Sequence, residues 1–270
     1  GAIINVPCPS QVSEHLWQLS ADYWHDVRVA VRRQFGDIFI LPQCAAAGDL
    51  SPHILHYKQA LARRLALKGM TERQDIAERI TTAFGEVLSW ARNDIRTEVP
   101  VRHAVETVEL SRRRISKEEY EEDSRMLEEL NKQQFTTEGT PKERLIHDSF
   151  LAAQRKRAQS VIDRYRAQDA NPKLPMELHV IRIGDVAFAS NRFELYMDYM
   201  HRIQARSPFE QTFVVQLAGV PGPDGGTYLP TERAVWGKGY GASRYCNHVG
   251  PEGGQELVEH TVRMLNDVRG

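Results

Sequence analysis

The sequence predicts an α/β protein in which a mixed sheet is flanked by helices and carries a charged helical insertion. Short apolar runs of strand length alternate along the chain with amphipathic segments of helical period. Glycine and proline clusters mark the turns between them. Residues 112–170 are highly charged and contain only sparse apolar stripes, which indicates two helices that stand off the core.

The first third of the chain predicts two strands, over residues 2–6 and 38–41, and two helices. The first helix carries Trp24 and Val27 and ends near Gly36, because glycine suits a helix C-terminus. The second starts at Thr71, since acidic side chains in its first turn complement the helix dipole.

The remaining elements are expected in the order strand, two charged helices, two strands, helix, strand, loop and helix, over residues 101–110, 117–134, 141–168, 178–183, 186–189, 194–206, 212–218, 219–226 and 255–268. Residues 242–254 also have the composition of a loop. The arginines within 155–157 and 164–166 are interpreted as a solvated helix face.

The composition excludes several classes of protein. The formal net charge is -1, whereas nucleic-acid-binding domains usually carry a strong basic excess, so no nucleic-acid partner is expected. No apolar run reaches about 18 residues, so no transmembrane segment is expected. Cys8, Cys44 and Cys246 form no CxxC pair and are interpreted as free thiols. Residues 1–6 begin as a strand without a signal peptide, so the natural protein is expected to be longer. Nothing in the sequence indicates an oligomeric state.

Two residues near the N-terminal strands are candidates for a site. Ser51 follows the strand at 38–41, at the sheet edge where α/β proteins place ligands, and could be a nucleophile. On residues alone, a hydroxyl that closes a turn or caps a helix is the favoured interpretation. Cys8 could be a thiolate metal ligand, although a lone cysteine is more often an inert buried residue.

Three further candidates lie in the second half of the chain. Glu194 stands at a strand-to-helix junction, where a carboxylate is either a cap or a metal ligand. Tyr228 and Tyr240 stand in glycine-rich stretches and are either packing aromatics or phenolic donors to a developing oxyanion. The histidines show no HxH or HExxH spacing, which makes a site role for any one of them the weaker interpretation.

Taken in order, these segments resemble the neutral/alkaline (non-lysosomal) ceramidase family, over the C-terminal part of its catalytic domain. Gly48-Asp49-Leu50-Ser51-Pro52-His53 is similar to the family's GDxSPN motif, with histidine in place of asparagine. The Gly184-Asp185 strand and Phe193-Glu194 resemble the family's IGD strand and GE pair. Tyr228-Leu-Pro-Thr-Glu232 and Tyr240-Gly-Ala-Ser243 resemble YxTTxEEY and YEGAS, and Tyr240 follows Tyr228 by 12 residues, as in the family.

The resemblance implies a zinc-dependent hydrolase of an N-acyl amide, such as a ceramide-like lipid. Glu194 and Tyr228 would be zinc ligands, Tyr240 would bind the scissile carbonyl, and Ser51 or water would attack it. Cys8 occupies the place of a zinc-binding histidine, and thiolate is a ligand that Zn²⁺ accepts.

The resemblance covers most of residues 1–270 except the insertion at 112–170, and it places the remaining zinc histidine and a catalytic arginine upstream of this chain. A secreted or periplasmic location would follow from it. The alternative is a non-catalytic ceramidase-like protein that binds a lipid or a protein partner, which the cysteine at position 8 favours.

Overall fold

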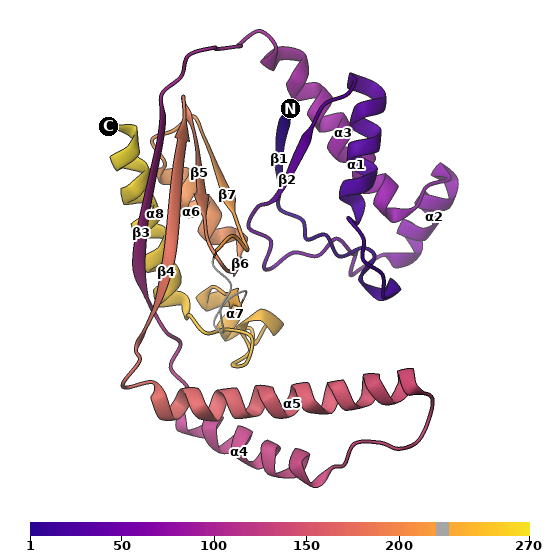
Figure 1. Ribbon diagram of the computed structural model, residues 1–270, viewed down its shortest axis with the longest axis vertical. Coiled ribbons are helices and arrows are strands. Elements are labelled where there is room, and N and C mark those ends of the chain that lie inside the picture. The colour runs from indigo at the N-terminus through magenta and orange to yellow at the C-terminus, as the bar shows by residue number, and fades with distance from the viewer. Residues whose placement is uncertain (220–226) are drawn as a thin grey trace.

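The computed structural model describes residues 1–219 and 227–270, and most of the loop predicted over 219–226 lies outside the described residues. Figure 1 shows three parts: a four-stranded sheet backed by helices, a two-stranded sheet with its own helices beside it, and a long helical pair across one end. The strands are β1 Ala2–Val6, β2 Ile40–Cys44, β3 Val101–Ser111, β4 Lys173–Ile183, β5 Val186–Ser190, β6 Glu194–Leu195, β7 Gln211–Val215 and β8 Tyr228–Leu229. The helices are α1 Tyr23–Phe35, α2 Lys58–Lys68, α3 Glu72–Ala91, α4 Lys117–Lys132, α5 Pro141–Ala167, α6 Met197–Arg206, α7 Glu232–Trp236 and α8 Pro251–Arg269.

The larger sheet has the order β3-β4-β5-β7 and is mixed, as the sequence predicts. The pairs β3–β4 and β4–β5 are antiparallel, whereas β5 and β7 are parallel. Gly184 makes the tight turn between β4 and β5 with a φ of 63°, a conformation that glycine adopts without steric cost. Because α6 crosses between β5 and β7, these two strands can run in the same direction.

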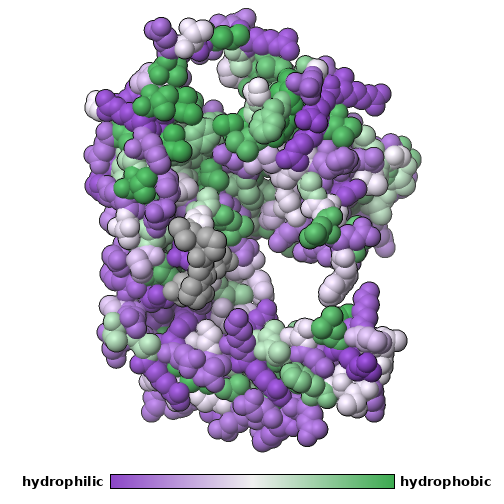
Figure 2. Space-filling view, in the orientation of Figure 1, coloured by the Kyte–Doolittle hydropathy of each residue, from purple (hydrophilic) through white to green (hydrophobic). Residues whose placement is uncertain are grey.

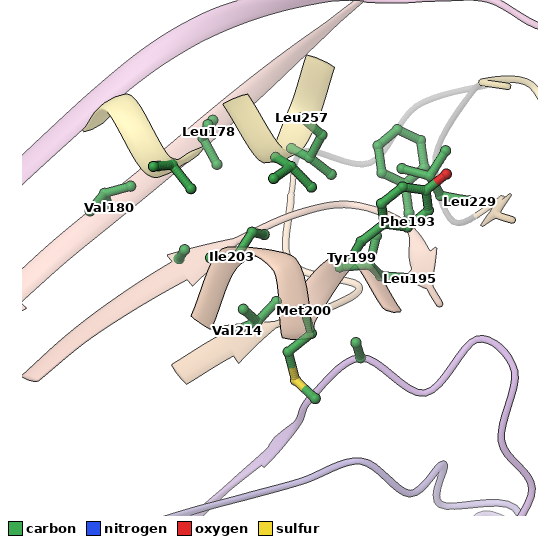
Figure 3. Packing of buried hydrophobic residues seen from close by; sticks show 14 of the residues in the cluster. Leu178, Val180, Phe193, Leu195, Tyr199, Met200, Ile203, Val214, Leu229 and Leu257 are labelled. Atoms are coloured by element: carbon green, nitrogen blue, oxygen red, sulfur yellow. The ribbon is translucent and has the colours of Figure 1, made fainter. Parts of the chain in front are cut away.

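One core lies between this sheet and the helices α6 and α8. Leu178 and Val180 point from β4 toward Leu257 of α8, and Ile203 of α6 meets Val214 of β7 (Figure 3). The alternation along β4, where every second side chain is buried, explains why one face of the sheet packs against helices. Burial of apolar area at roughly 25 cal/mol per Å² is the main force that holds this layer together.

A second core joins β1 and β2 to α1 and α3. The two strands are parallel, with Ala2 opposite Ile40, and their apolar side chains meet Val27 and Val31 of α1 and Ile76 of α3. Thr71 caps α3 with a capping box, which confirms the predicted start of this helix. The strand β2 begins and ends a few residues later than predicted.

The charged insertion is a hairpin of α4 and α5 that lies across one end of the molecule (Figure 1). Both helices begin with capping boxes, at Ser116 and Thr140, and α5 has proline in its first turn. These signals explain why the predicted bounds agree with the observed ones within two residues. The described residues contain no helix that is long and apolar enough to span a membrane.

Several local predictions were wrong. The strand β4 begins at Lys173 rather than at 178, and β7 ends at Val215 rather than at 218. The helix expected from Glu194 begins only at Met197, because residues 194 and 195 form β6, which pairs with β8. The loop expected over 242–254 ends at Gly250, where Pro251 occupies the first turn of α8. The helices α2 and α7 and the short strand β8 were not predicted.

Candidate functional site

Glu194 and Tyr228 face one another across the smallest sheet of the fold. The strands β6 and β8 have two residues each, run parallel and place Glu194 opposite Tyr228 in register. The backbone N–H of Glu194 also donates to the carbonyl of Thr227 at 3.1 Å. The chain thus brings a carboxylate and a phenol together from positions that the sequence analysis treated as separate motifs.

Burial determines the protonation of this pair. Desolvation raises the pKa of Glu194, and a hydrogen bond from the Tyr228 hydroxyl opposes this effect. Burial also raises the pKa of Tyr228, and its hydrogen bond to the Glu194 carboxylate raises it further. The phenol therefore keeps its proton at neutral pH and donates a hydrogen bond to the carboxylate, unless a cation displaces the proton.

Tyr240 continues the cluster toward solvent. Its ring meets that of Tyr228 edge to face, with 5.8 Å between centroids, and its side chain is 61% exposed. A hydrogen bond with the Cys246 side chain, together with burial, raises the pKa of Tyr240. The hydroxyl is therefore a neutral donor that a ligand can reach from solvent.

Cys246 was interpreted from the sequence only as a free thiol, yet it lies within this cluster. Its backbone carbonyl accepts a hydrogen bond from the backbone N–H of Tyr228 at 3.0 Å, and its side chain forms a hydrogen bond with the side chain of Tyr240. The one sign of this contact in the sequence was that Cys246 lies close to Tyr240 along the chain.

Two glycines permit the close packing around the pair. A Cβ on Gly48 would overlap the backbone of Glu194, and the N–H of Gly48 donates to the carbonyl of Leu195 at 2.8 Å. A Cβ on Gly241 would lie 2.7 Å from the Tyr196 hydroxyl and 2.8 Å from the Tyr228 ring. Both glycines belong to segments that carry the family resemblance, so part of that pattern reflects a steric requirement.

Gln216 fixes the loop after β2 against β6. Its side-chain carbonyl accepts the N–H groups of Ala47 at 2.9 Å and Leu195 at 3.1 Å, and the residue is buried. Beyond this clamp, the Asp49 carboxylate accepts the N–H of Met197 at 2.9 Å. The loop that leads to Ser51 is therefore anchored beside Glu194 through its backbone and Asp49.

Ser51 and Cys8 lie in a groove of about 690 Å³ between β1, β7 and α3. Apolar side chains of α3, among them Ile80 and Phe84, form one wall of this groove. The Ser51 hydroxyl accepts the N–H of His53 at 3.1 Å and so closes a turn. This contact agrees with the sequence-based interpretation of Ser51 as a turn-closing hydroxyl. Among the described residues, no hydrogen bond or ion pair joins Ser51 to Glu194.

The charge of Glu194 also acts on the Cys44 thiol. Burial raises the pKa of Cys44 to about 11, and the Glu194 carboxylate contributes to the increase. Burial also raises the pKa of Cys8, on which the charges of Arg79 and Asp22 act. The two residues are neighbours, since the Cys44 Sγ lies 3.6 Å from the backbone carbonyl oxygen of Cys8.

The helical insertion contacts the segment that carries Tyr240, which corrects the interpretation of its arginines as a solvated face. Arg164 donates to the carbonyls of Arg244 at 2.6 Å and Asn247 at 2.9 Å. The Arg157 guanidinium lies 4.9 Å from the ring centroid of Tyr245, which in turn packs edge to face on Tyr240. A continuous row of side chains thus connects α5 to Tyr228.

The described residues do not fit a complete zinc site. Structural and catalytic zinc sites take at least three protein ligands from histidine, cysteine and carboxylate side chains. No group of three such side chains converges anywhere in residues 1–219 and 227–270. Glu194 and Tyr228 offer two oxygen donors, so they form part of a site and need further donors.

The structural comparison identifies the fold as that of the neutral ceramidases. The chain superposes on neutral ceramidase from Pseudomonas aeruginosa with a TM-score of 0.58 and 13% sequence identity. A second solved structure, a ceramidase complexed with C2, gives a TM-score of 0.56 and 12% identity. Both superpositions cover 99% of this chain but only 44% and 45% of those chains. No family model and no curated protein matches the sequence. The chain therefore has the fold of somewhat less than half of a neutral ceramidase.

Proposed function

We propose that this chain is part of a hydrolase that cleaves the amide bond of an N-acyl lipid, with release of a fatty acid and an amine. The observation that carries the proposal is the pairing of Glu194 with Tyr228, beside the exposed side chain of Tyr240. The ceramidase resemblance implies a role at the reaction centre for each of these three residues. The likeness to neutral ceramidases in fold supports the same substrate class.

Each residue has a distinct part in this proposal. Tyr240 donates a hydrogen bond to the scissile carbonyl oxygen, where negative charge develops during attack. Glu194 and Tyr228 contribute two of the oxygen donors of a zinc ion, and the remaining donors come from residues that do not contact this pair in the structure. Cys8 remains a predicted ligand and Ser51 a predicted nucleophile; both line a separate groove, which Glu194 and Tyr228 do not line.

The test is hydrolysis of a fluorogenic N-acyl amide by the natural protein with zinc present. Glu194→Gln keeps the shape of the side chain but removes its charge, and we expect it to lower kcat/KM by at least about 100-fold. Glu128→Gln, on the exposed side of α4, is the matched control and should leave turnover unchanged. If the wild-type protein shows no turnover, the non-catalytic alternative, a lipid- or protein-binding relative, takes its place.

A further inference from the structure

The larger sheet has one face that no described helix covers. The helices α6 and α8 pack on the face that carries Leu178 and Val180. The opposite face carries the alternate residues of the same strands, such as Val105 on β3 and Ile181 and Ile183 on β4. In layered α/β folds a sheet is normally buried on each apolar face, so this bare face needs an explanation.

The bare face is apolar where a solvated face would be polar. Val101 is 65% exposed, Val105 46% and Ile183 40%. Ile183 lines a hollow of about 520 Å³ together with Phe188 and Val215. Figure 2 shows hydrophobic residues concentrated in the upper half of the view, over the larger sheet and across toward β1 and β2. An antiparallel sheet that faces water has alternating polar residues at such positions.

The smaller sheet contributes to the same hollow. Ile3 of β1 and Gln43 of β2 line it together with the larger sheet. The other face of β1 and β2 packs on α1 and α3, whereas Ile3 and Leu41 remain 44% and 43% exposed. The uncovered face of the smaller sheet carries Ile3 and Leu41, and that of the larger sheet carries Val101, Val105, Ile183 and Phe188. Ile3, Ile183 and Phe188 line the hollow between the two sheets, so these six residues are treated as one shared apolar surface.

We propose that this shared apolar surface is the docking site for a polypeptide segment folded like the part of neutral ceramidases that has no counterpart in this chain. Somewhat more than half of each matched ceramidase chain is left unmatched, although nearly all of this chain is matched. The inference goes beyond the proposed activity, because it concerns assembly and holds whether or not the assembled protein turns over an amide.

The polar residues on this face are compatible with burial by a protein partner. His103 and His179 stack with 5.2 Å between ring centroids and join Nε2 to Nδ1 at 3.0 Å. His179 also joins the Glu177 carboxylate at 2.7 Å through Nε2. Three polar side chains thus satisfy one another in a row, which lowers the desolvation cost when a partner covers them.

The test compares the accessibility of two valines in the isolated chain and in the natural protein, purified under native conditions from the cells that make it. Val105→Cys lies on the shared apolar surface, and Val29→Cys lies on the outer side of α1 with a similar exposed fraction, 53% against 46%. In the isolated chain we expect both cysteines to react with a maleimide at similar rates. In the natural protein we expect labelling at position 105 to be at least tenfold slower and labelling at position 29 to be unchanged.

A second measurement identifies what covers the surface. With p-benzoylphenylalanine in place of Val105, irradiation should give a cross-link to a peptide from outside residues 1–270. That peptide should fall in a region whose fold matches the unmatched part of the ceramidases. Equal labelling of both cysteines in the natural protein would overturn the proposal. So would a cross-link to a second copy of residues 1–270, or protection that disappears when detergent extracts bound lipid.

Discussion

Glu194 and Tyr228 are directly opposed across a parallel pair of two-residue strands, with a hydrogen bond between phenol and carboxylate. Such short strands gain little from their own backbone pairing, so the surrounding packing must hold them in register. Gly48 on one side and Gly241 on the other leave room for this packing. The pair is thus fixed by sterics as well as by hydrogen bonding, and several variants should separate the two contributions.

Gly241→Ala should displace the Tyr228 ring. The added Cβ would lie 2.7 Å from the Tyr196 hydroxyl and 2.8 Å from Tyr228, closer than carbon atoms pack. We expect a loss of about 1–3 kcal/mol in the free energy of unfolding, measured by urea denaturation. Gly239→Ala is the matched control in the same loop, because its nearest neighbour is 3.6 Å away, and it should cost little. Equal losses for both variants would contradict the steric argument.

Tyr240→Phe should impair turnover at little cost in stability, since the hydrogen bond it loses to Cys246 lies at the surface. The ring is 61% exposed and its packing on Tyr228 does not need the hydroxyl. If that hydroxyl binds the developing oxyanion, its removal should lower kcat by about 100-fold and leave KM nearly unchanged. Steady-state kinetics on an N-acyl amide check the expectation, with Tyr57→Phe, which is 85% exposed, as the control. A variant that retains wild-type kcat would exclude the hydroxyl from the reaction.

Arg164→Ala should loosen the segment that carries Tyr240 and Cys246. Its guanidinium donates to two backbone carbonyls, those of Arg244 and Asn247, and the variant leaves both carbonyls without this partner. We expect about 2 kcal/mol of destabilisation in chemical unfolding, together with faster hydrogen exchange around residue 246. Arg125→Ala, on the exposed side of α4, should change neither quantity. Unchanged exchange in Arg164→Ala would show that the insertion does not stabilise this segment.

Much of the fold could be predicted because its signals are local. The capping boxes at Thr71, Ser116 and Thr140 and the turn at Gly184 depend on residues only a few positions apart. The mixed sheet flanked by helices followed from the alternation of strand and helix periods. The strands β6 and β8 could not be predicted, because two-residue strands leave no periodic pattern and exist only through their long-range pairing.

The candidate site was predictable only where motif and packing coincide. The pairing of Glu194 with Tyr228 and the contact of Tyr228 with Tyr240 join residues that the family resemblance already singled out. The part played by Cys246 depends on a side-chain contact and was missed. The anchoring role of Arg164 was missed for a similar reason, since an arginine on a polar helix gives no sign of which carbonyls it reaches.

The stability of the isolated chain should depend on whether Glu194 is charged, and therefore on pH. Burial raises the pKa of this carboxyl in the folded state above its usual value near 4.5, so the folded chain binds the proton more tightly than the unfolded chain. This contribution to stability is fully present below the unfolded pKa and is lost as the pH rises through the folded pKa. Glu194→Gln should therefore raise the midpoint of thermal unfolding at pH 7 and have little effect at pH 4.

Thermal unfolding of the metal-free chain at the two pH values measures this difference. Glu128→Gln serves again as the control, since an exposed carboxylate should give the same small change at both pH values. A cation bound to Glu194 would stabilise the charged form, so added zinc in the natural assembly should reverse the effect and make the wild type the more stable protein at pH 7. A wild-type chain that is already more stable than Glu194→Gln at pH 7 without metal would contradict the direction assigned to this pKa. Such a site, which costs stability when empty, is the pattern expected where a carboxylate is kept for binding or catalysis.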